Sequence, residues 1–142
     1  MKHIEISERT LHFKQPAGTS RGVYTTRKSY YLTITDDNRS SIKGVGECAT
    51  LPDLSCDAVP EYFKILNDVC RMVEQTGNIP YDILRPYPSI LFGLETAFAQ
   101  LDANGSTCLY DTPFGRGEEG IAINGLVWMG TFEEMYSRLE TK

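Results

Sequence analysis

The sequence predicts an α+β fold, in which a three-stranded antiparallel meander is followed by helices. Three observations lead to this fold class. In three stretches within the first 48 residues, apolar side chains alternate with polar ones, as in strands with one buried face. Over residues 51–105 they recur every three or four positions, as on the buried face of a helix. A nearly continuous apolar run, residues 121–129, stands apart near the end of the chain.

The composition is that of an ordinary globular protein, with 142 residues, 41% of them hydrophobic and 23% charged. The net charge of -5 argues against nucleic acid or an anionic membrane as a partner. No apolar run approaches the ~20 residues that a membrane span needs. The N-terminus carries an acid, Glu5, where a signal peptide would be apolar. We therefore expect a cytoplasmic protein.

The cysteines and histidines do not have the spacing of a known site. No two of the four cysteines form a Cys-x-x-Cys pair, and their separations fit neither a zinc ribbon nor a disulfide framework. We expect reduced thiols at Cys48, Cys56, Cys70 and Cys108. Both histidines, His3 and His12, fall in the first predicted strand without a serine or cysteine elbow. A hydrolase triad is therefore not predicted.

The first predicted strand covers residues 2–13. The apolar positions change phase along it, which predicts a bulge near residues 7–9. The polar stretch 14–27, with its proline and glycines, is expected to be a long loop, which in proteins is usually functional or disordered. Alternation then predicts a second strand at 30–34 and a third at 42–48.

The third strand ends in Gly44-Val45-Gly46-Glu47-Cys48. Two glycines two residues apart leave one strand face bare, so that either another backbone or a ligand can approach closely. Glu47 adds a carboxylate where the strand ends. A simpler interpretation of the same residues is a strand end with a solvated acid.

The first long helix is predicted from apolar spacing between Val59 and Val73. Ser55 or Asp57 is expected to cap its N-terminus, and Gly77 to end it. A short turn of helix is expected at residues 79–85, between prolines.

A second long helix is predicted to open at Ser89 and to stop at Gly105. Ala97 on this helix would let another element pack closely. Glu95, within the same helix, is expected to make a structural hydrogen bond or ion pair rather than to act in catalysis.

The last part of the chain does not belong to this unit. Residues 106–120 form a connector rich in glycine and charge. The run 121–129 has the character of a strand buried on both faces of a parallel sheet, and Thr131 caps a predicted amphipathic helix at 132–139. One strand and one helix do not make a stable sheet. We therefore expect two domains, 1–105 and 106–142, the second being only the start of a larger one.

Four stretches together resemble the N-terminal capping domain of the enolase superfamily. Within that superfamily, the chain is similar to the muconate-lactonizing subgroup, and most similar to the o-succinylbenzoate synthases of menaquinone biosynthesis. The loop Thr19-Ser20-Arg21-Gly22 favours the synthases over the racemases and epimerases of the group. The stretches that carry the resemblance are Pro16–Gly22, Gly44–Ala49, Pro88–Ala97 and Ile123–Leu126.

The resemblance implies a capping domain followed by a modified TIM barrel that carries the chemistry. Such enzymes bind Mg²⁺ through three acids on barrel strands and use barrel lysines to remove a proton α to a carboxylate. The reaction implied is the dehydration of 2-succinyl-6-hydroxy-2,4-cyclohexadiene-1-carboxylate to 2-succinylbenzoate. A barrel needs ~250 residues, so the metal ligands and lysines are expected beyond Lys142. No catalytic residue and no metal ligand is expected within the chain, which alone should be inactive.

The resemblance also implies a substrate-binding role for Thr19, Ser20 and Arg21, on a loop that folds over the barrel mouth, and for Glu47. Arg21 could bind a substrate carboxylate bidentately, and the alternative is a solvated arginine. Glu47 could orient the loop or meet the barrel, and the alternative is a surface acid. Trp128 is expected in a core or facing the barrel.

Two other functions stay open at this point. One is an N-acylamino-acid racemase or dipeptide epimerase of the same superfamily, because the capping loop alone separates these enzymes poorly from the synthases. The other is a non-catalytic binding module. Such a module would have little use for the apolar run 121–129, which would expose apolar surface.

Overall fold

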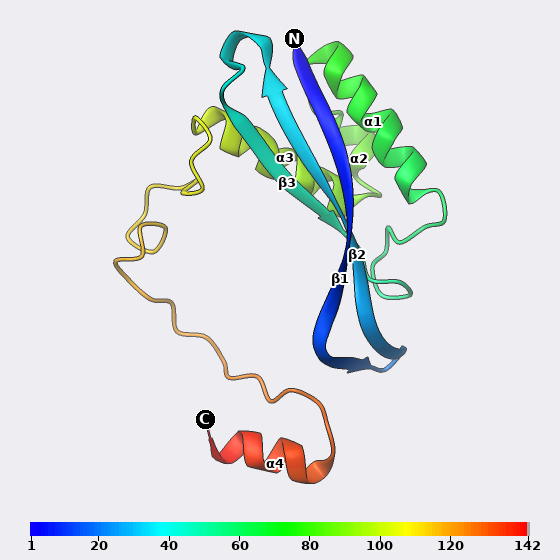
Figure 1. The fold of residues 1–142 in the computed structure, drawn as a ribbon, viewed down its shortest axis with the longest axis vertical. Coiled ribbons are helices and arrows are strands. Elements are labelled where there is room, and N and C mark those ends of the chain that lie inside the picture. The colour runs from blue at the N-terminus through cyan, green and yellow to red at the C-terminus, as the bar shows by residue number, and fades with distance from the viewer. Residues whose placement is uncertain (142) are drawn as a thin grey trace.

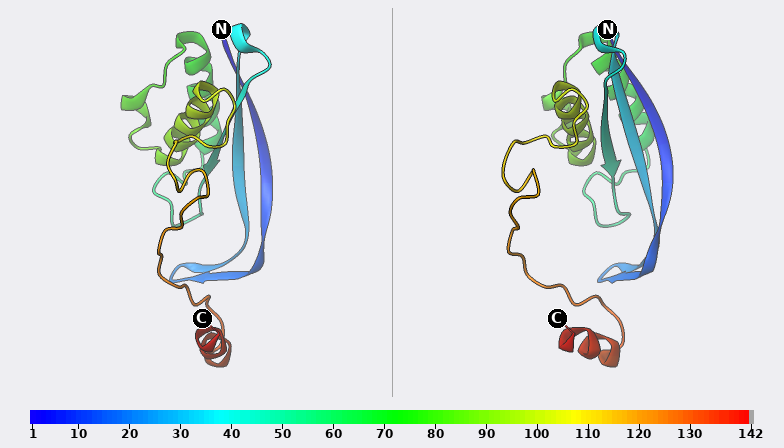
Figure 2. Two further views of the ribbon diagram at one scale, coloured as in Figure 1. Left: turned by 90° about the vertical axis from the view of Figure 1, so that its left-hand side faces the viewer. Right: turned by 60° about the vertical axis from the view of Figure 1, so that its left-hand side comes forward.

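The computed structural model describes residues 1–141 and has the predicted α+β architecture (Figure 1). Its three strands form one antiparallel sheet in the order β1-β2-β3, so the predicted meander is confirmed. Helices α1 to α3 lie on one side of this sheet (Figure 2). The elements are β1 (Lys2–Thr19), β2 (Gly22–Asp36), a 3-10 turn η1 (Asp37–Arg39), β3 (Lys43–Ala49), α1 (Tyr62–Thr76), α2 (Tyr81–Leu84), α3 (Pro88–Asp102) and α4 (Phe132–Glu140).

The first two strands are longer than predicted and form a hairpin that turns at Ser20 and Arg21. The expectation of a long loop at residues 14–27 is therefore wrong. Side chains along this part of the hairpin are mostly exposed, so the sequence lacks the alternation that marks a half-buried strand. The strands here are held by backbone hydrogen bonds, which do not require an alternating pattern of side chains.

The bulge predicted near residues 7–9 is also misplaced. Pairing runs without interruption from Lys2↔Asp36 to His12↔Thr26, and the register shifts only between His12 and Ala17. There, residues 13–16 lie opposite Thr25 alone. Pro16 has no N–H to donate to a strand ladder, which explains why pairing fails at this position.

The core lies between the sheet and the helices. Leu32 and Ile34 of β2 are fully buried, as are Leu66 of α1 and Leu94 of α3. The apolar spacing that predicted the two long helices is thus confirmed. Burial of a side chain of this size contributes about 1.5–3 kcal/mol, so these residues dominate the stability of the sheet–helix body.

The glycine pair of β3 is explained by a neighbouring backbone rather than by a ligand. A Cβ at Gly44 would lie 1.9 Å from the carbonyl oxygen of Ala97, and one at Gly46 would lie 1.8 Å from that of Gly93. Helix α3 therefore occupies the bare strand face. Gln100 of α3 also accepts a hydrogen bond from the Val45 N–H at 2.7 Å, which satisfies a backbone donor on the edge strand β3.

The helix ends follow the predicted signals, with one exception. Gly77 ends α1 in the left-handed conformation at φ 73°, as expected. Neither Ser55 nor Asp57 caps α1, which begins only at Tyr62. Asp57 is buried and instead accepts hydrogen bonds from the Ser89 backbone N–H at 2.8 Å and from its hydroxyl at 2.6 Å. Asp57 therefore caps the first turn of α3.

Beyond α3 the chain runs through an extended connector to α4 (Figure 1). The predicted helix is confirmed, with Thr131 as N-cap and Glu134 completing a capping box. The predicted buried strand at 121–129 is not formed, and Ile123 is 87% exposed. A strand needs a neighbouring strand to satisfy its backbone, and within the described residues no strand pairs with this run. Within residues 1–141, no helix has the length and apolar character to cross a membrane.

Candidate functional site

The predicted substrate-binding residues Thr19, Ser20 and Arg21 lie together at the turn of the β1–β2 hairpin. The Thr19 hydroxyl donates to the Gly22 carbonyl at 3.0 Å and accepts from the Arg21 N–H at 3.1 Å. These two bonds hold the turn, and all three side chains are exposed. The end of the hairpin projects beyond the helices and bends toward their side of the sheet (Figure 2). A serine, a threonine and an arginine are thus presented on a projecting tip.

Glu47, the fourth predicted residue, is not part of this group. It lies on β3 opposite Tyr31, and from there to Gly22 the strand β2 extends for about 30 Å. Its nearest charge is the Arg27 guanidinium, at 4.0 Å, and both side chains are more than one-third exposed. An exposed pair at this distance contributes little to stability. The structure therefore separates Glu47 from the hairpin tip.

The end of the hairpin is tied to the loop that follows β3. The Tyr24 hydroxyl donates a hydrogen bond to the Pro52 carbonyl at 2.7 Å. Sequence reasoning missed Tyr24. The only available signal was a single large aromatic residue within a polar, glycine-containing stretch.

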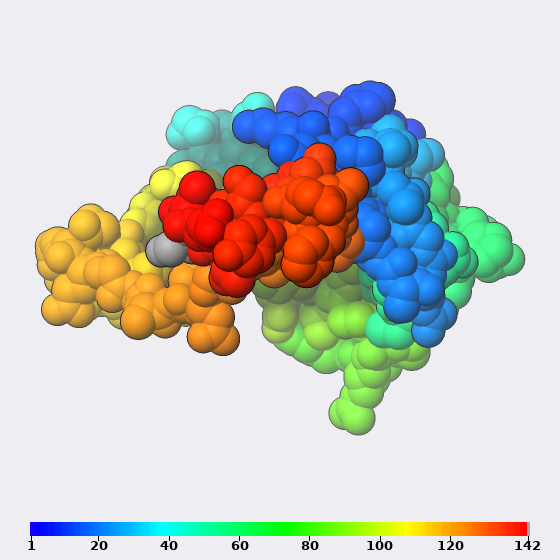
Figure 3. Space-filling model, turned by 90° about the horizontal axis from the view of Figure 1, so that it is seen from below, coloured from blue at the N-terminus to red at the C-terminus, as the bar shows by residue number. Residues whose placement is uncertain are grey.

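The same end of the hairpin also contacts the part of the chain around α4. The Trp128 indole N–H donates to the Pro16 carbonyl at 3.3 Å, and Arg138 donates to the Gln15 side-chain oxygen at 3.2 Å. A Cβ at Gly18 would lie 3.0 Å from the sulfur of Met129. Figure 3 shows α4 and the residues before it lying against the hairpin strands. Trp128, expected in a core or facing a barrel, here contacts the hairpin.

The connector contains a compact loop organised by Arg116. Its guanidinium pairs with Glu118 at 2.8 and 2.9 Å and also with Asp111. The neighbouring guanidinium lowers the pKa of the Glu118 carboxyl. The Thr112 hydroxyl accepts from the Gly115 N–H at 3.0 Å. These contacts are local, so the arginine shapes the connector and does not face the hairpin tip.

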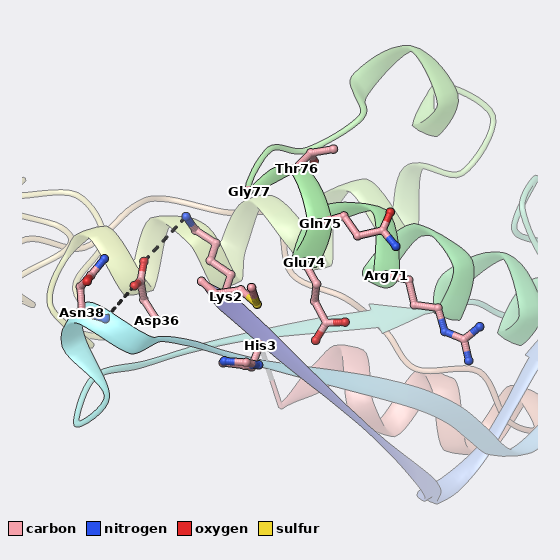
Figure 4. Close-up of a pocket in the computed structure, with 10 residues that line it drawn as sticks. Lys2, His3, Asp36, Asn38, Arg71, Glu74, Gln75, Thr76 and Gly77 are labelled. Atoms are coloured by element: carbon pink, nitrogen blue, oxygen red, sulfur yellow. Dashed lines mark hydrogen bonds and ion pairs between the residues drawn. The ribbon is translucent and has the colours of Figure 1, made fainter.

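A broad, open pocket lies at the other end of the sheet, between the chain start and α1 (Figure 4). Several of its charged groups are bound by neighbouring protein groups. Lys2 lies 3.9 Å from Asp36, and Glu74 accepts the Ile4 N–H at 2.8 Å. Two lining groups, the N-terminal ammonium and His3, lower the pKa of the adjacent Asp37. These contacts account for Lys2, Asp36 and Glu74, whereas Arg71, which also lines the pocket, makes no hydrogen bond or ion pair within residues 1–141.

Glu95 makes none of the hydrogen bonds or ion pairs found in residues 1–141 and is exposed on α3. The structural contact expected for it is therefore wrong. Its exposure on the outer face of the helix explains why an acid is tolerated among apolar neighbours.

The described residues bring together no three His, Cys, Asp or Glu side chains that could hold a metal ion. Residues 1–141 therefore do not fit a magnesium site. All four cysteines are unpaired. Burial raises the pKa of the Cys48 and Cys70 thiols to about 12, so both remain protonated and unreactive at neutral pH.

No family model matches the chain. A curated o-succinylbenzoate synthase from Desulfotalea psychrophila (strain LSv54 / DSM 12343) is 28% identical over an alignment of 175 residues, covering 100% of this chain and 47% of that protein. The predicted resemblance to the enolase superfamily is confirmed. The chain spans about half the length of the curated relative it matches.

Solved structures show the same enolase-type fold. The crystal structure of MenC from Desulfotalea psychrophila LSv54 has a TM-score of 0.59 and 22% identity, and the match covers 97% of this chain and 45% of that one. An enolase family member from Agrobacterium tumefaciens with homology to dipeptide epimerases has a TM-score of 0.55 and 18% identity, over 73% of this chain and 31% of that one.

Proposed function

We propose that this chain is the substrate-capping part of an o-succinylbenzoate synthase-like lyase. The complete enzyme would dehydrate 2-succinyl-6-hydroxy-2,4-cyclohexadiene-1-carboxylate to 2-succinylbenzoate in menaquinone biosynthesis. The observation that carries this proposal is the match to a synthase over the whole chain rather than over one motif. A cytoplasmic location goes with this role and with the unpaired cysteines.

The proposed division of labour follows the two domains. Residues 1–105 would cap the active site, and residues 106–142 would form the connector and the first strand–helix unit of a (β/α) barrel. The barrel would be the main partner of the capping domain. Magnesium would bind on the barrel, outside residues 1–141, because these residues offer no suitable group of ligands. We expect the 142-residue chain alone to be inactive.

The hairpin tip supplies the chemistry that a cap needs. The proposed substrate carries two carboxylates, and a guanidinium can bind a carboxylate through two parallel charge-assisted hydrogen bonds. Arg21 is exposed at the tip and makes no ion pair within the described residues, so it is available for this contact. The hydroxyls of Thr19 and Ser20 would complete the wall of the pocket. Closure of the tip over the substrate would exclude water.

Glu47 would have a separate task. It lies far from the tip and beside Arg27, so we propose that it meets the barrel at the domain interface and does not contact the substrate directly.

A dipeptide epimerase is the second candidate function. The likeness to the Agrobacterium tumefaciens protein, whose title names homology to dipeptide epimerases, favours it. That likeness covers 73% of this chain, whereas the MenC likeness covers 97%. The wider coverage supports the synthase as the first choice.

The test is to read the gene on both sides of this coding sequence and to assay its complete product. We expect a Lys-x-Lys strand and three spaced acids after Lys142. We also expect magnesium-dependent loss of the cyclohexadiene substrate, followed by its ultraviolet absorbance. Epimerisation of dipeptides without dehydration would favour the second candidate. A complete product that lacks these residues and is inactive on both substrates would overturn the proposed enzyme function and favour a non-catalytic binding module.

A further inference from the structure

The end of the hairpin beyond the bulge is held weakly by the sheet itself. Only three residue pairs, from Ala17↔Tyr24 to Thr19↔Gly22, join its strands. Most of its side chains are exposed, and Val23 is 68% accessible to solvent. No apolar core underlies it. Residues 13–16 also interrupt the strand pairing that would otherwise fix its position relative to the rest of the sheet. Its orientation must therefore be set by other contacts.

Three hydrogen bonds from outside the hairpin supply these contacts. One joins Tyr24 to Pro52 in the loop after β3. The other two reach the bulge from more than a hundred residues away, from Trp128 to Pro16 and from Arg138 to Gln15. The bulge interrupts the strand pairing, and it also provides the two acceptors of these hydrogen bonds, the Pro16 carbonyl and the Gln15 side-chain amide.

Arg138 joins both sides of this contact through a single guanidinium. Its Nη1 donates to the carbonyls of Trp128 at 2.6 Å and Met129 at 3.0 Å. Its Nη2 donates to the Gln15 side-chain oxygen at 3.2 Å. A planar guanidinium can make these bonds at once, whereas an ammonium cannot match the same fixed fork.

The residue at position 130 fits this arrangement. A Cβ at Gly130 would lie 3.2 Å from Arg138 Nη1 and 2.3 Å from a Glu134 carboxylate oxygen. Glycine therefore leaves the space that the guanidinium and the capping box of α4 both use. The Arg138 side chain is therefore held in place by contacts with the segment before α4 and with the hairpin.

We propose that Arg138 is a positioning residue for the hairpin tip. It fixes the bulge, through Gln15, against the backbone of Trp128 and Met129, and so determines where Thr19, Ser20 and Arg21 are held. It touches no substrate. The link to substrate capture rests on the proposed function, but the mechanical link between α4 and the hairpin does not.

The experiment uses the 142-residue chain, in which Trp128 is the only tryptophan. Tryptophan emission, its quenching by acrylamide and amide hydrogen exchange are compared for wild type, Arg138→Ala, Arg138→Lys and Gln15→Ala. The matched control is Arg85→Ala, which removes an exposed arginine whose one ion pair within residues 1–141 is with Asp82.

For Arg138→Ala we expect red-shifted emission, quenching increased about two-fold, and hydrogen exchange of residues 17–24 accelerated at least ten-fold. Exchange at Leu32 and Ile34 in the core should not change. Arg138→Lys should not restore the wild-type values, because the fork is lost. Gln15→Ala should accelerate exchange in the hairpin, and the double variant Gln15→Ala/Arg138→Ala should add nothing to Arg138→Ala. Arg85→Ala should match wild type.

Unchanged emission and hairpin exchange in Arg138→Ala would overturn the proposal. If Arg138→Ala also accelerated exchange in the core, Gln15→Ala would decide, since Gln15 is exposed and outside the core; wild-type hairpin exchange in that variant would overturn the proposal. None of these measurements requires catalysis. A failure of the proposed enzyme function therefore leaves this result standing, and the reverse also holds.

Discussion

The two halves of the β1–β2 hairpin share one pair of strands but are held by different forces. The half from Lys2 to His12 pairs with a part of β2 whose residues Leu32 and Ile34 are fully buried under helices. The half beyond the bulge is exposed and is fixed by one hydrogen bond from Tyr24 and by two that reach the bulge itself. Apolar burial gives the first half stability and a fixed register. The second half contributes little to stability, so its residues are free to serve binding.

The largest loss of stability should come from adding a side chain where β3 and α3 are in close contact. Gly46→Ala would place a methyl group 1.8 Å from the Gly93 carbonyl oxygen, so strand and helix must separate. We expect the free energy of unfolding to fall by about 3 kcal/mol or more, measured by urea denaturation. Gly120→Ala is the control, because nothing lies within 4 Å of its added Cβ. Equal stability of the two variants would mean that α3 does not pack on β3 as described.

A smaller loss is expected from the buried cap of α3. Asp57→Ala would leave the Ser89 N–H and hydroxyl without their acceptor. We expect a loss of about 2 kcal/mol in the same denaturation experiment. Asp57→Asn, which retains an acceptor oxygen, should lose less. If alanine and asparagine cost the same, the hydrogen bonds to Ser89 would not be the source of the stability.

At the hairpin tip, a substitution should affect substrate binding more than stability. Arg21→Ala should change the free energy of unfolding by less than about 0.5 kcal/mol, because the side chain is exposed. In the complete protein it should raise KM about ten-fold, corresponding to the loss of about 1.4 kcal/mol of binding. Lys14→Ala, also exposed on the hairpin, is the control for a change of charge. Wild-type kinetic constants in Arg21→Ala would remove this residue from the substrate site.

The smallest effect concerns the exposed carboxylates at the far end of the sheet. The N-terminal ammonium and then His3 lower the pKa of Asp37. A carboxyl with a lowered pKa contributes stability above its unfolded value of ~3.9, and this contribution disappears as the pH falls through the folded pKa. Unfolding of Asp37→Asn and wild type should therefore differ at pH 6 and converge by pH 2. A difference that persisted at pH 2 would mean that its origin is not the ionised carboxylate.

The part of the fold that buries apolar surface was accessible from sequence. Apolar alternation marked the strand containing Leu32, three- and four-residue spacing marked α1 and α3, and the glycine pair of β3 indicated a close approach. The meander and the helix order followed from these patterns. Turn and cap residues such as Gly77 and Thr131 then set helix ends correctly.

The distal hairpin and its contacts could not be predicted in the same way. Its strands are exposed, so no periodicity marks them, and backbone pairing extends where the sequence suggested a loop. Thr19, Ser20 and Arg21 lie together because they are adjacent in sequence, and their role in substrate binding stays a prediction. Arg138 was missed because its partner Gln15 lies at the other end of the chain. Asp57 was assigned to the nearest helix, whereas tertiary packing gives it to α3.

The bulge has a further consequence for how this hairpin can vary. Adding or removing one residue in a continuous strand moves every later side chain to the opposite face. Here, residues 13–16 lie opposite Thr25 alone, so a change in length beyond them need not alter the facing of Ile4 and Ile6. The tip can therefore be lengthened, shortened or exchanged as a unit while the buried half of the hairpin keeps its register. Tips transplanted from enolase superfamily proteins should be accepted at this junction.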